Sequence, residues 1–185
     1  MAQSKYIKSV LKAAGGIPHS TEWFRNKIKE FGTPKSMDLI RDGKRTSVPT
    51  FGLLNMFVYD PKGKEKLPYY DTFPLVLPIE KYNNGFLGIN LHYLSIPMRI
   101  KLLDRLTTFA NNNKFDESTK LNANYSSLKR IDLIKPCLKR YLAGHVKSKF
   151  RKVTADEFIV ATLLPVQKFR KQSDSHVFGK SRGMI

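Results

Sequence analysis

FGLLNMFVY (residues 51–59), FPLVLP (73–78) and GFLGINLHY (85–93) decide the fold. Aromatic and branched aliphatic residues dominate all three segments, which is typical of β-strands. In the third segment Leu87, Ile89, Leu91 and Tyr93 share one face, because strand side chains alternate. The intervening turn Tyr82-Asn-Asn-Gly85 predicts a hairpin. Two prolines in the second segment predict an edge or bulged strand.

Downstream the apolar period changes to that of a helix, from Pro97 to about Asn111. This helix is predicted to pack on the sheet through Ile100, Leu103, Leu106 and Phe109. Weaker helical patterns cover 123–130 and 133–143, a short strand fits 147–153, and a helix fits 158–164. The sequence therefore predicts an α+β fold, with a small antiparallel sheet packed with several helices.

Charge divides the 185 residues into a core and two ends. Residues 51–100 carry 5 Lys and Arg against 4 Asp and Glu, so the positive excess lies in the flanking segments. Short helices are predicted for 4–14 and 20–32, and a polar linker for 33–50. The predicted organisation is an N-terminal helical or extended arm (1–50), an α+β core domain (51–165) and an extended basic tail (166–185).

The formal net charge of +18 favours polyanionic partners. The single cysteine, Cys137, cannot form an internal disulfide, and the charged start of the chain is unlike a secretory signal. No stretch is apolar for long enough to cross a membrane. We therefore expect folding in the cytoplasm and no membrane partner.

A cluster of basic residues is the strongest candidate for a binding site. Its nine members fall within 24 residues: Lys129, Arg130, Lys135, Lys139, Arg140, Lys147, Lys149, Arg151 and Lys152. Tyr141 and Phe150 are interleaved with them. Such a cluster can neutralise phosphates of double-stranded DNA without reading its sequence. It can equally contact an acidic protein neighbour, and the sequence leaves both partners open.

Signals for catalysis are weak. No nucleotide-binding, hydrolase or metalloprotease motif is present, and the four histidines lack metal-ligand spacing, so no metal, cofactor or catalytic residue is predicted. A metal-dependent nuclease remains as an alternative, with Asp132, Asp156 and Glu157 as carboxylates near Lys152.

The segment Leu67-Pro-Tyr-Tyr-Asp71 is predicted to form a structural corner with the third strand. Tyr69, Tyr70 and Asp71 follow a proline that restricts the chain, while Asn90 and His92 share a strand face. Their side chains can satisfy backbone groups that the turn leaves unpaired. An acid/base pair of Asp71 and His92 is the catalytic alternative.

Several longer runs resemble a known family. These are MFVYDPK (56–62), LPYYDTFPLVLP (67–78), GFLGINLHYL (85–94), KFDE (114–117), HVKSKF (145–150) and ADEF (155–158). Over residues 51–185 they resemble virion proteins of T-even-type and marine contractile-tailed phages that are described as DNA end protectors. The resemblance implies a place in the virion and supplies no catalytic motif.

Three functions follow as expectations. The first is a non-enzymatic virion protein that binds DNA ends, or lines the portal, neck or tail lumen, through the basic cluster. The second is a tail or baseplate subunit whose arms bind other virion proteins. The third is the nuclease.

Overall fold

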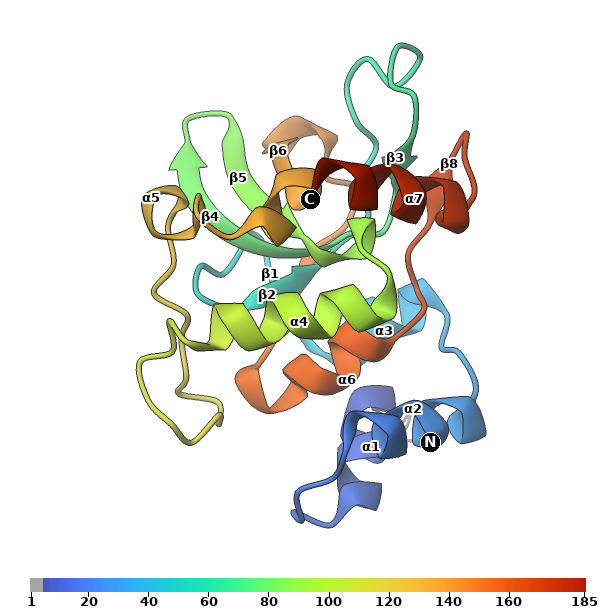
Figure 1. The fold of residues 1–185 in the computed structure, drawn as a ribbon, viewed down its shortest axis with the longest axis vertical. Coiled ribbons are helices and arrows are strands. Elements are labelled where there is room, and N and C mark those ends of the chain that lie inside the picture. The colour runs from blue at the N-terminus through green and yellow to red at the C-terminus, as the bar shows by residue number, and fades with distance from the viewer. Residues whose placement is uncertain (1–4) are drawn as a thin grey trace.

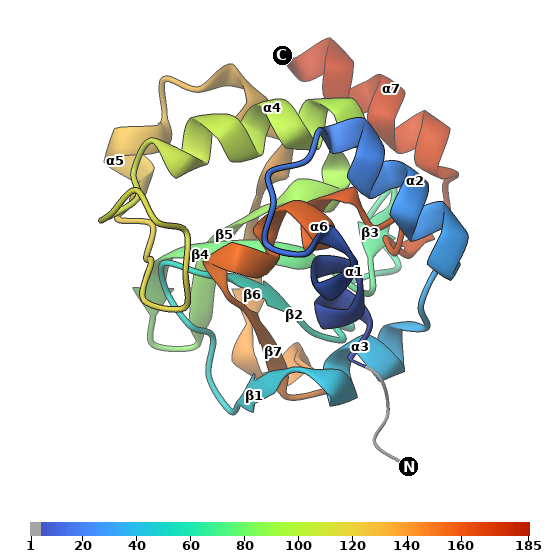
Figure 2. The same ribbon diagram turned by 90° about the horizontal axis from the view of Figure 1, so that it is seen from below.

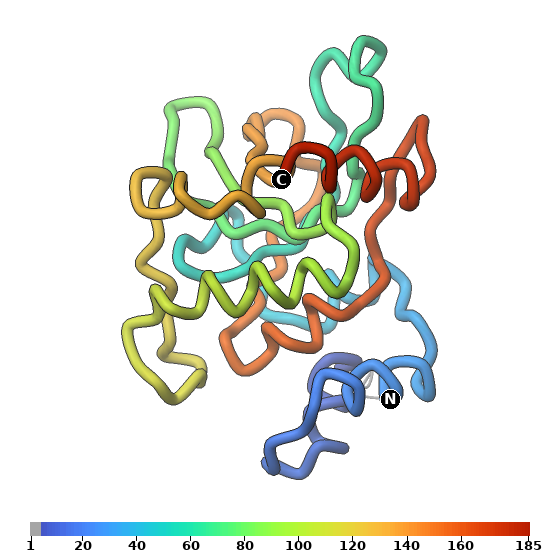
Figure 3. Tube along the Cα trace, viewed as in Figure 1, coloured from blue at the N-terminus to red at the C-terminus, as the bar shows by residue number. Residues whose placement is uncertain are grey.

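The computed structural model describes residues 5–185 and confirms an α+β fold (Figure 1). Its main sheet has six antiparallel strands in the order β1-β7-β2-β4-β5-β6. Their bounds are Lys44–Thr46 (β1), Leu54–Met56 (β2), Leu75–Tyr82 (β4), Gly85–Asn90 (β5), Leu138–Leu142 (β6) and Phe150–Val153 (β7). The short strands β3 (Tyr70–Asp71) and β8 (Phe169–Arg170) pair separately, which joins segments far apart in the chain (Figure 3).

The predicted hairpin is present as β4 and β5, joined at the expected turn. Gly85 is needed there, because a Cβ at this position would lie 1.9 Å from the carbonyl oxygen of Tyr141. The second predicted strand is central and not at an edge, since β4 lies between β2 and β5. Its ladder shifts register between Pro78 and Glu80, so the predicted bulge is what accommodates the proline.

The sheet is strongly curved. The ring of Phe57, just after β2, lies 5.3 Å from Tyr141 of β6 and 4.8 Å from Phe150 of β7, although the two strands are far apart in the sheet order. A second, aromatic core therefore fills the concave face. It consists of Phe57, Tyr59, Val76, Phe86, Tyr141 and Phe150.

Helices cover the opposite face of the sheet. The helices α4 (Ile96–Thr107) and α6 (Phe158–Leu163) lie side by side, and α1 (Tyr6–Ala14) and α2 (Thr21–Phe31) cover α6 from outside (Figure 2). In α4 the side chains of Leu102, Leu103 and Leu106 are buried. Ile100 and Phe109, also predicted to face the sheet, are half-buried against the same core.

The prediction that residues 1–50 form an arm outside the core is wrong for the described residues. Ile7 and Val10 of α1 are fully buried in the main core. The expected linker contains α3 (Ser36–Asp42) and β1, and the backbone N–H of Tyr6 donates to Asp42 Oδ2 at 2.8 Å. An apolar stripe of the first two helices determines their packing, while their many charges lie on the outer side.

Two predictions in the C-terminal half are also wrong. Residues 133–143 form a 3₁₀ turn (Asp132–Cys137) and then β6, because Pro136 interrupts a helix and the following residues pair with β5. The tail is not extended: Ser173 caps α7 (Asp174–Met184), and Val177 is buried. The other 3₁₀ turns are Leu91–Tyr93, Ala143–His145 and Ala155–Glu157, and α5 covers Tyr125–Leu128. No helix in residues 5–185 is long and apolar enough to span a membrane.

Candidate functional site

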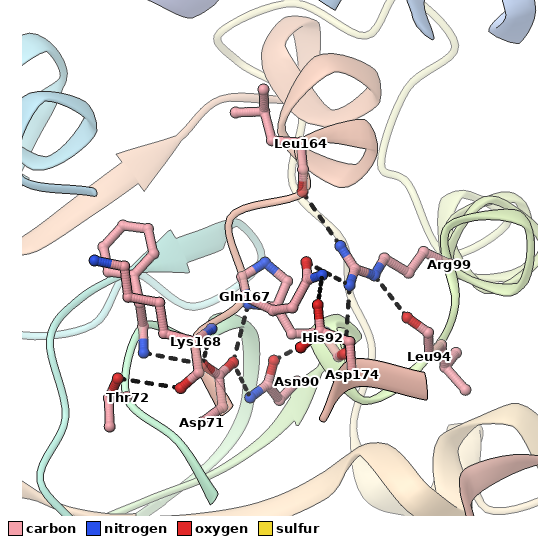
Figure 4. A network of polar contacts seen from close by, with 11 residues as sticks. Asp71, Thr72, Asn90, His92, Leu94, Arg99, Leu164, Gln167, Lys168 and Asp174 are labelled. Carbon is pink, nitrogen blue, oxygen red and sulfur yellow. Dashed lines mark hydrogen bonds and ion pairs between the residues drawn. The ribbon is translucent and has the colours of Figure 1, made fainter. Parts of the chain in front are cut away.

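The predicted corner is a buried network centred on Asp71 (Figure 4). Asp71 Oδ2 accepts hydrogen bonds from Asn90 Nδ2 at 3.2 Å and from His92 Nδ1 at 2.9 Å. Its Oδ1 accepts from the backbone N–H groups of Phe73 at 2.9 Å and Lys168 at 3.0 Å. One carboxylate therefore joins β3, β5 and the segment before β8.

Tyr69 and Tyr70 lie beside this network rather than within it. The ring of Tyr69 lies 6.1 Å from that of Tyr93, and Tyr70 pairs with Arg170 in the two-stranded sheet. Both side chains are half-buried. The structure thus brings Asp71, Asn90 and His92 together, as predicted, and places the two tyrosines along an adjacent cleft.

Asp71 and His92 are shielded from solvent. Both are buried, and His92 is wholly inaccessible. Burial lowers the pKa of His92, so the neutral ring donates to Asp71. Burial alone would raise the pKa of Asp71, but its contact with His92 and its two backbone donors outweigh this and lower it. A buried ionised carboxylate with four donors is a stable arrangement.

We predict that His92 contributes to the pH dependence of stability. Below about pH 6.5 the unfolded chain binds a proton at this position that the folded protein does not bind, so the free energy of unfolding decreases as the pH is lowered. The maximum slope for one group is about 1.4 kcal/mol per pH unit. His92→Gln should remove this contribution from urea titrations between pH 4.5 and 7.5, whereas the same change at exposed His176 should not. Equal slopes for wild type and His92→Gln would contradict the assignment.

Arg99 is a second buried polar residue, and sequence reasoning missed it. Its guanidinium donates to the carbonyl oxygens of Leu94 at 2.8 Å and Leu164 at 3.3 Å, and to Gln167 Oε1 at 2.9 Å. Gln167 in turn donates to Asp174 of α7 at 2.7 Å. Burial lowers the pKa of Arg99 to about 10. The sequence contained a signal for the burial of Arg99, because this residue shares a helical face with Leu102, Leu103 and Leu106.

Two of the nine clustered cations have carboxylate partners. Arg151 is buried, and it donates to both carboxylate oxygens of Glu157 at 2.8 and 3.1 Å. The prediction that Arg151 belongs to the binding surface is therefore wrong, because its guanidinium compensates the buried carboxylate of Glu157. Lys135 forms an ion pair with Asp132 at 2.8 Å.

The seven other cations have no carboxylate partner within residues 5–185. All are exposed or half-exposed: Lys129, Arg130, Lys139, Arg140, Lys147, Lys149 and Lys152. They do not lie on one strand or one helix. Lys139 and Arg140 are on β6 at one edge of the sheet, and Lys152 is on β7 near the other. The cluster in sequence is thus distributed around the curved sheet.

The carboxylates of the nuclease hypothesis do not converge. Glu157 is occupied by Arg151, and Asp132 is paired with Lys135 in a different part of the fold. Among the described residues, no three His, Cys, Asp or Glu side chains are arranged to hold a metal ion. The proposed set of Asp132, Asp156 and Glu157 is therefore not a site.

A cleft lies between the segment 59–71 and β6, with a volume of about 630 Å³. Lys139 extends along it with its ammonium 4.0 Å from the ring centre of Tyr93. Arg140 donates to Asn84 at 2.9 Å and stacks 4.7 Å from the ring centre of Tyr82. Lys62, outside the cluster recognised in the sequence, lines the same cleft. No local pattern could reveal it, because the walls come from distant segments.

The sequence model for the phage T4 terminal DNA protecting protein matches residues 4–182. The match covers almost the whole chain, including the N-terminal segment in which no resemblance was recognised. No curated protein and no solved structure matches the chain.

Proposed function

Because the chain belongs to the phage T4 terminal DNA protecting protein family, we propose that it binds the ends of double-stranded DNA without catalysis, as part of the phage particle. The seven cations without carboxylate partners carry this proposal. A cation that no carboxylate neutralises can release the counterions of a phosphate, and this release drives binding to DNA.

The proposed location is the virion, where the ends of packaged DNA lie, with assembly in the host cytoplasm. The portal, neck or tail lumen would give the basic surface access to these ends. Contacts with other virion proteins would use the packed N-terminal segment, whose exposed apolar side chains include Ile17 in the α1–α2 loop, Phe31 at the end of α2 and Met37 in α3. A tail or baseplate subunit that locks acidic neighbour proteins through its arms has less support, since the helices α1, α2, α3 and α7 within the proposed arms all place residues in the main core.

Binding of the full chain to a blunt-ended linear duplex should depend steeply on salt. If four of the seven cations contact phosphates, the slope of log K against log salt is about −3.6, a loss of roughly a hundredfold between 50 and 200 mM. Lys149→Gln should reduce the slope by about 0.9. Lys135→Gln is the matched control and should change it little, because Asp132 already neutralises that cation.

End binding is tested by comparison with a covalently closed circle of the same sequence and by digestion with an exonuclease that enters at duplex ends. We expect tighter binding to the linear form and protection of its ends, without any cleavage by the protein. Equal affinity for both forms would contradict end binding. Divalent-metal-dependent cleavage would contradict the non-enzymatic part.

A further inference from the structure

The cleft beside β6 combines cations and aromatic rings from two facing segments. Lys139 and Arg140 come from β6, whereas Lys62, Tyr69 and Tyr70 come from the segment 59–71. Its only acidic lining residue is Asp71, whose carboxylate is already bound by four donors. The field inside the cleft is therefore positive, and it suits an anion that also presents a flat apolar surface.

Lys139 is the most informative residue of the cleft. The residue is half-buried, its ammonium lies over the ring of Tyr93, and no carboxylate within residues 5–185 forms an ion pair with it. Burial lowers its pKa, which records the free-energy cost of holding this charge there. A bound phosphate would compensate that charge. A cation held at such cost beside an open cleft indicates a ligand of opposite charge.

The aromatic wall is held in place before any ligand binds. The ammonium of Lys171 donates to the carbonyl oxygens of Lys64, Glu65 and Leu67, each within 2.8 Å. Lys171 itself has a φ of 72°, a left-handed conformation that is unfavourable for this residue type. These three hydrogen bonds tie the loop to the C-terminal segment, so the wall loses little entropy when a ligand binds.

The size of the cleft selects what can enter. Its volume of about 630 Å³ lies within the roughly 300–1,000 Å³ of sites for small ligands. It can hold a nucleotide but not a continuous duplex, in which each base is stacked and paired. A base at the end of a strand has a neighbour on one side only and separates from the duplex at the lowest cost.

We propose that this cleft receives the terminal nucleotide of a DNA strand, with its phosphate near Lys139, Arg140 and Lys62 and its base against Tyr69 and Tyr70. The proposal rests on the proposed binding of DNA ends and adds the site that distinguishes an end from internal duplex. Of the seven cations around the sheet, the five that lie outside the cleft attract any duplex, whereas the cleft, with Lys139 and Arg140, is accessible only to an end.

The test is the ratio of affinities for linear and circular duplexes of one sequence, measured with the full chain. Arg140→Gln and Lys139→Met should each lower this ratio by about tenfold, the effect of one charge-assisted contact. Lys149→Gln removes the same charge outside the cleft and should weaken both affinities equally. With 2-aminopurine at the terminal position, fluorescence should be quenched on binding to wild type and less so with Arg140→Gln.

The outcomes separate the two proposals. Arg140 is exposed, and its guanidinium contacts only the side chains of Asn84 and Tyr82 among the interactions described above. If wild type prefers linear DNA but Arg140→Gln keeps the full ratio and quenching, the cleft is not the end site. If wild type shows no preference for linear DNA, both proposals fail. Should Lys139→Met not fold, Arg140→Gln decides alone.

Discussion

Replacing Asp71 with Leu is expected to destabilise the protein by several kcal/mol. The carboxylate accepts four hydrogen bonds from buried or half-buried donors, two from backbone N–H groups and two from Asn90 and His92. Leucine accepts none. Each buried donor left unpaired costs about 1–3 kcal/mol, and a domain has only about 5–15 kcal/mol of stability. The Leu variant should therefore be largely unfolded or recovered in aggregates.

Urea denaturation followed by circular dichroism measures this effect. Asp104→Leu is the matched control, because Asp104 is exposed on α4 and its replacement should change stability by less than about 0.5 kcal/mol. A loss below about 1 kcal/mol for Asp71→Leu would show that the network relaxes or admits water. His92→Gln should be far milder, because Gln can still donate to Asp71, and it should also leave particle assembly intact.

Removing Glu157 is expected to have the second largest effect on stability. Its carboxylate binds Arg151 through two hydrogen bonds and also accepts from the backbone N–H of Thr154 at 3.2 Å. Glu157→Leu leaves a buried guanidinium with only Asp42, 4.0 Å away, as a carboxylate neighbour. Burial raises the pKa of Asp42, so that group is a weak substitute. Breaking one partner of a buried pair costs about 3–5 kcal/mol.

A double-mutant cycle with Arg151→Met separates pairing from packing. The double variant should be more stable than Glu157→Leu alone, because it removes the uncompensated charge along with its partner. If the two losses simply add, the pair contributes no coupling and the interpretation is wrong. Arg151→Met is also expected to leave the salt dependence of DNA binding unchanged, since this guanidinium faces the interior.

The sequence predicted the fold best where the information was local. The hairpin at 82–85 and the helix after Pro97 follow from turn chemistry and period. Strand alternation predicted that Asn90 and His92 share a face, but β5 ends at Asn90, and His92 lies in the 3₁₀ turn that Asn90 caps. The errors have one origin. The high density of charge at both ends of the chain led to the prediction of arms outside the core. A basic helix can nevertheless pack on the core through a narrow apolar stripe, as α1 does with Ile7 and Val10.

The candidate site was predicted only in part for a similar reason. Counting cations along the chain found Lys139 and Arg140 but could not distinguish them from Arg151. Glu157 compensates the charge of Arg151 inside the protein, so that this cation is not part of the binding surface. Lys62 was missed because the segment 59–71 meets β6 only through the tertiary fold. Which cations are neutralised, and which lie beside aromatic rings, depends on contacts between distant segments.

The network around Asp71 also fixes when the protein can fold during its synthesis. Asp71 accepts from Lys168, 97 positions later, and Arg99 reaches Gln167, 68 positions later. β1 and β2 both pair with β7. A nascent chain that has just emerged from the ribosome up to α4 thus has strands without their partners, and its Arg99 lacks the acceptors Leu164 and Gln167. The last twenty residues supply contacts that complete the core, so the native state forms only after translation is almost complete. Until then the unpaired apolar strands are exposed and can aggregate.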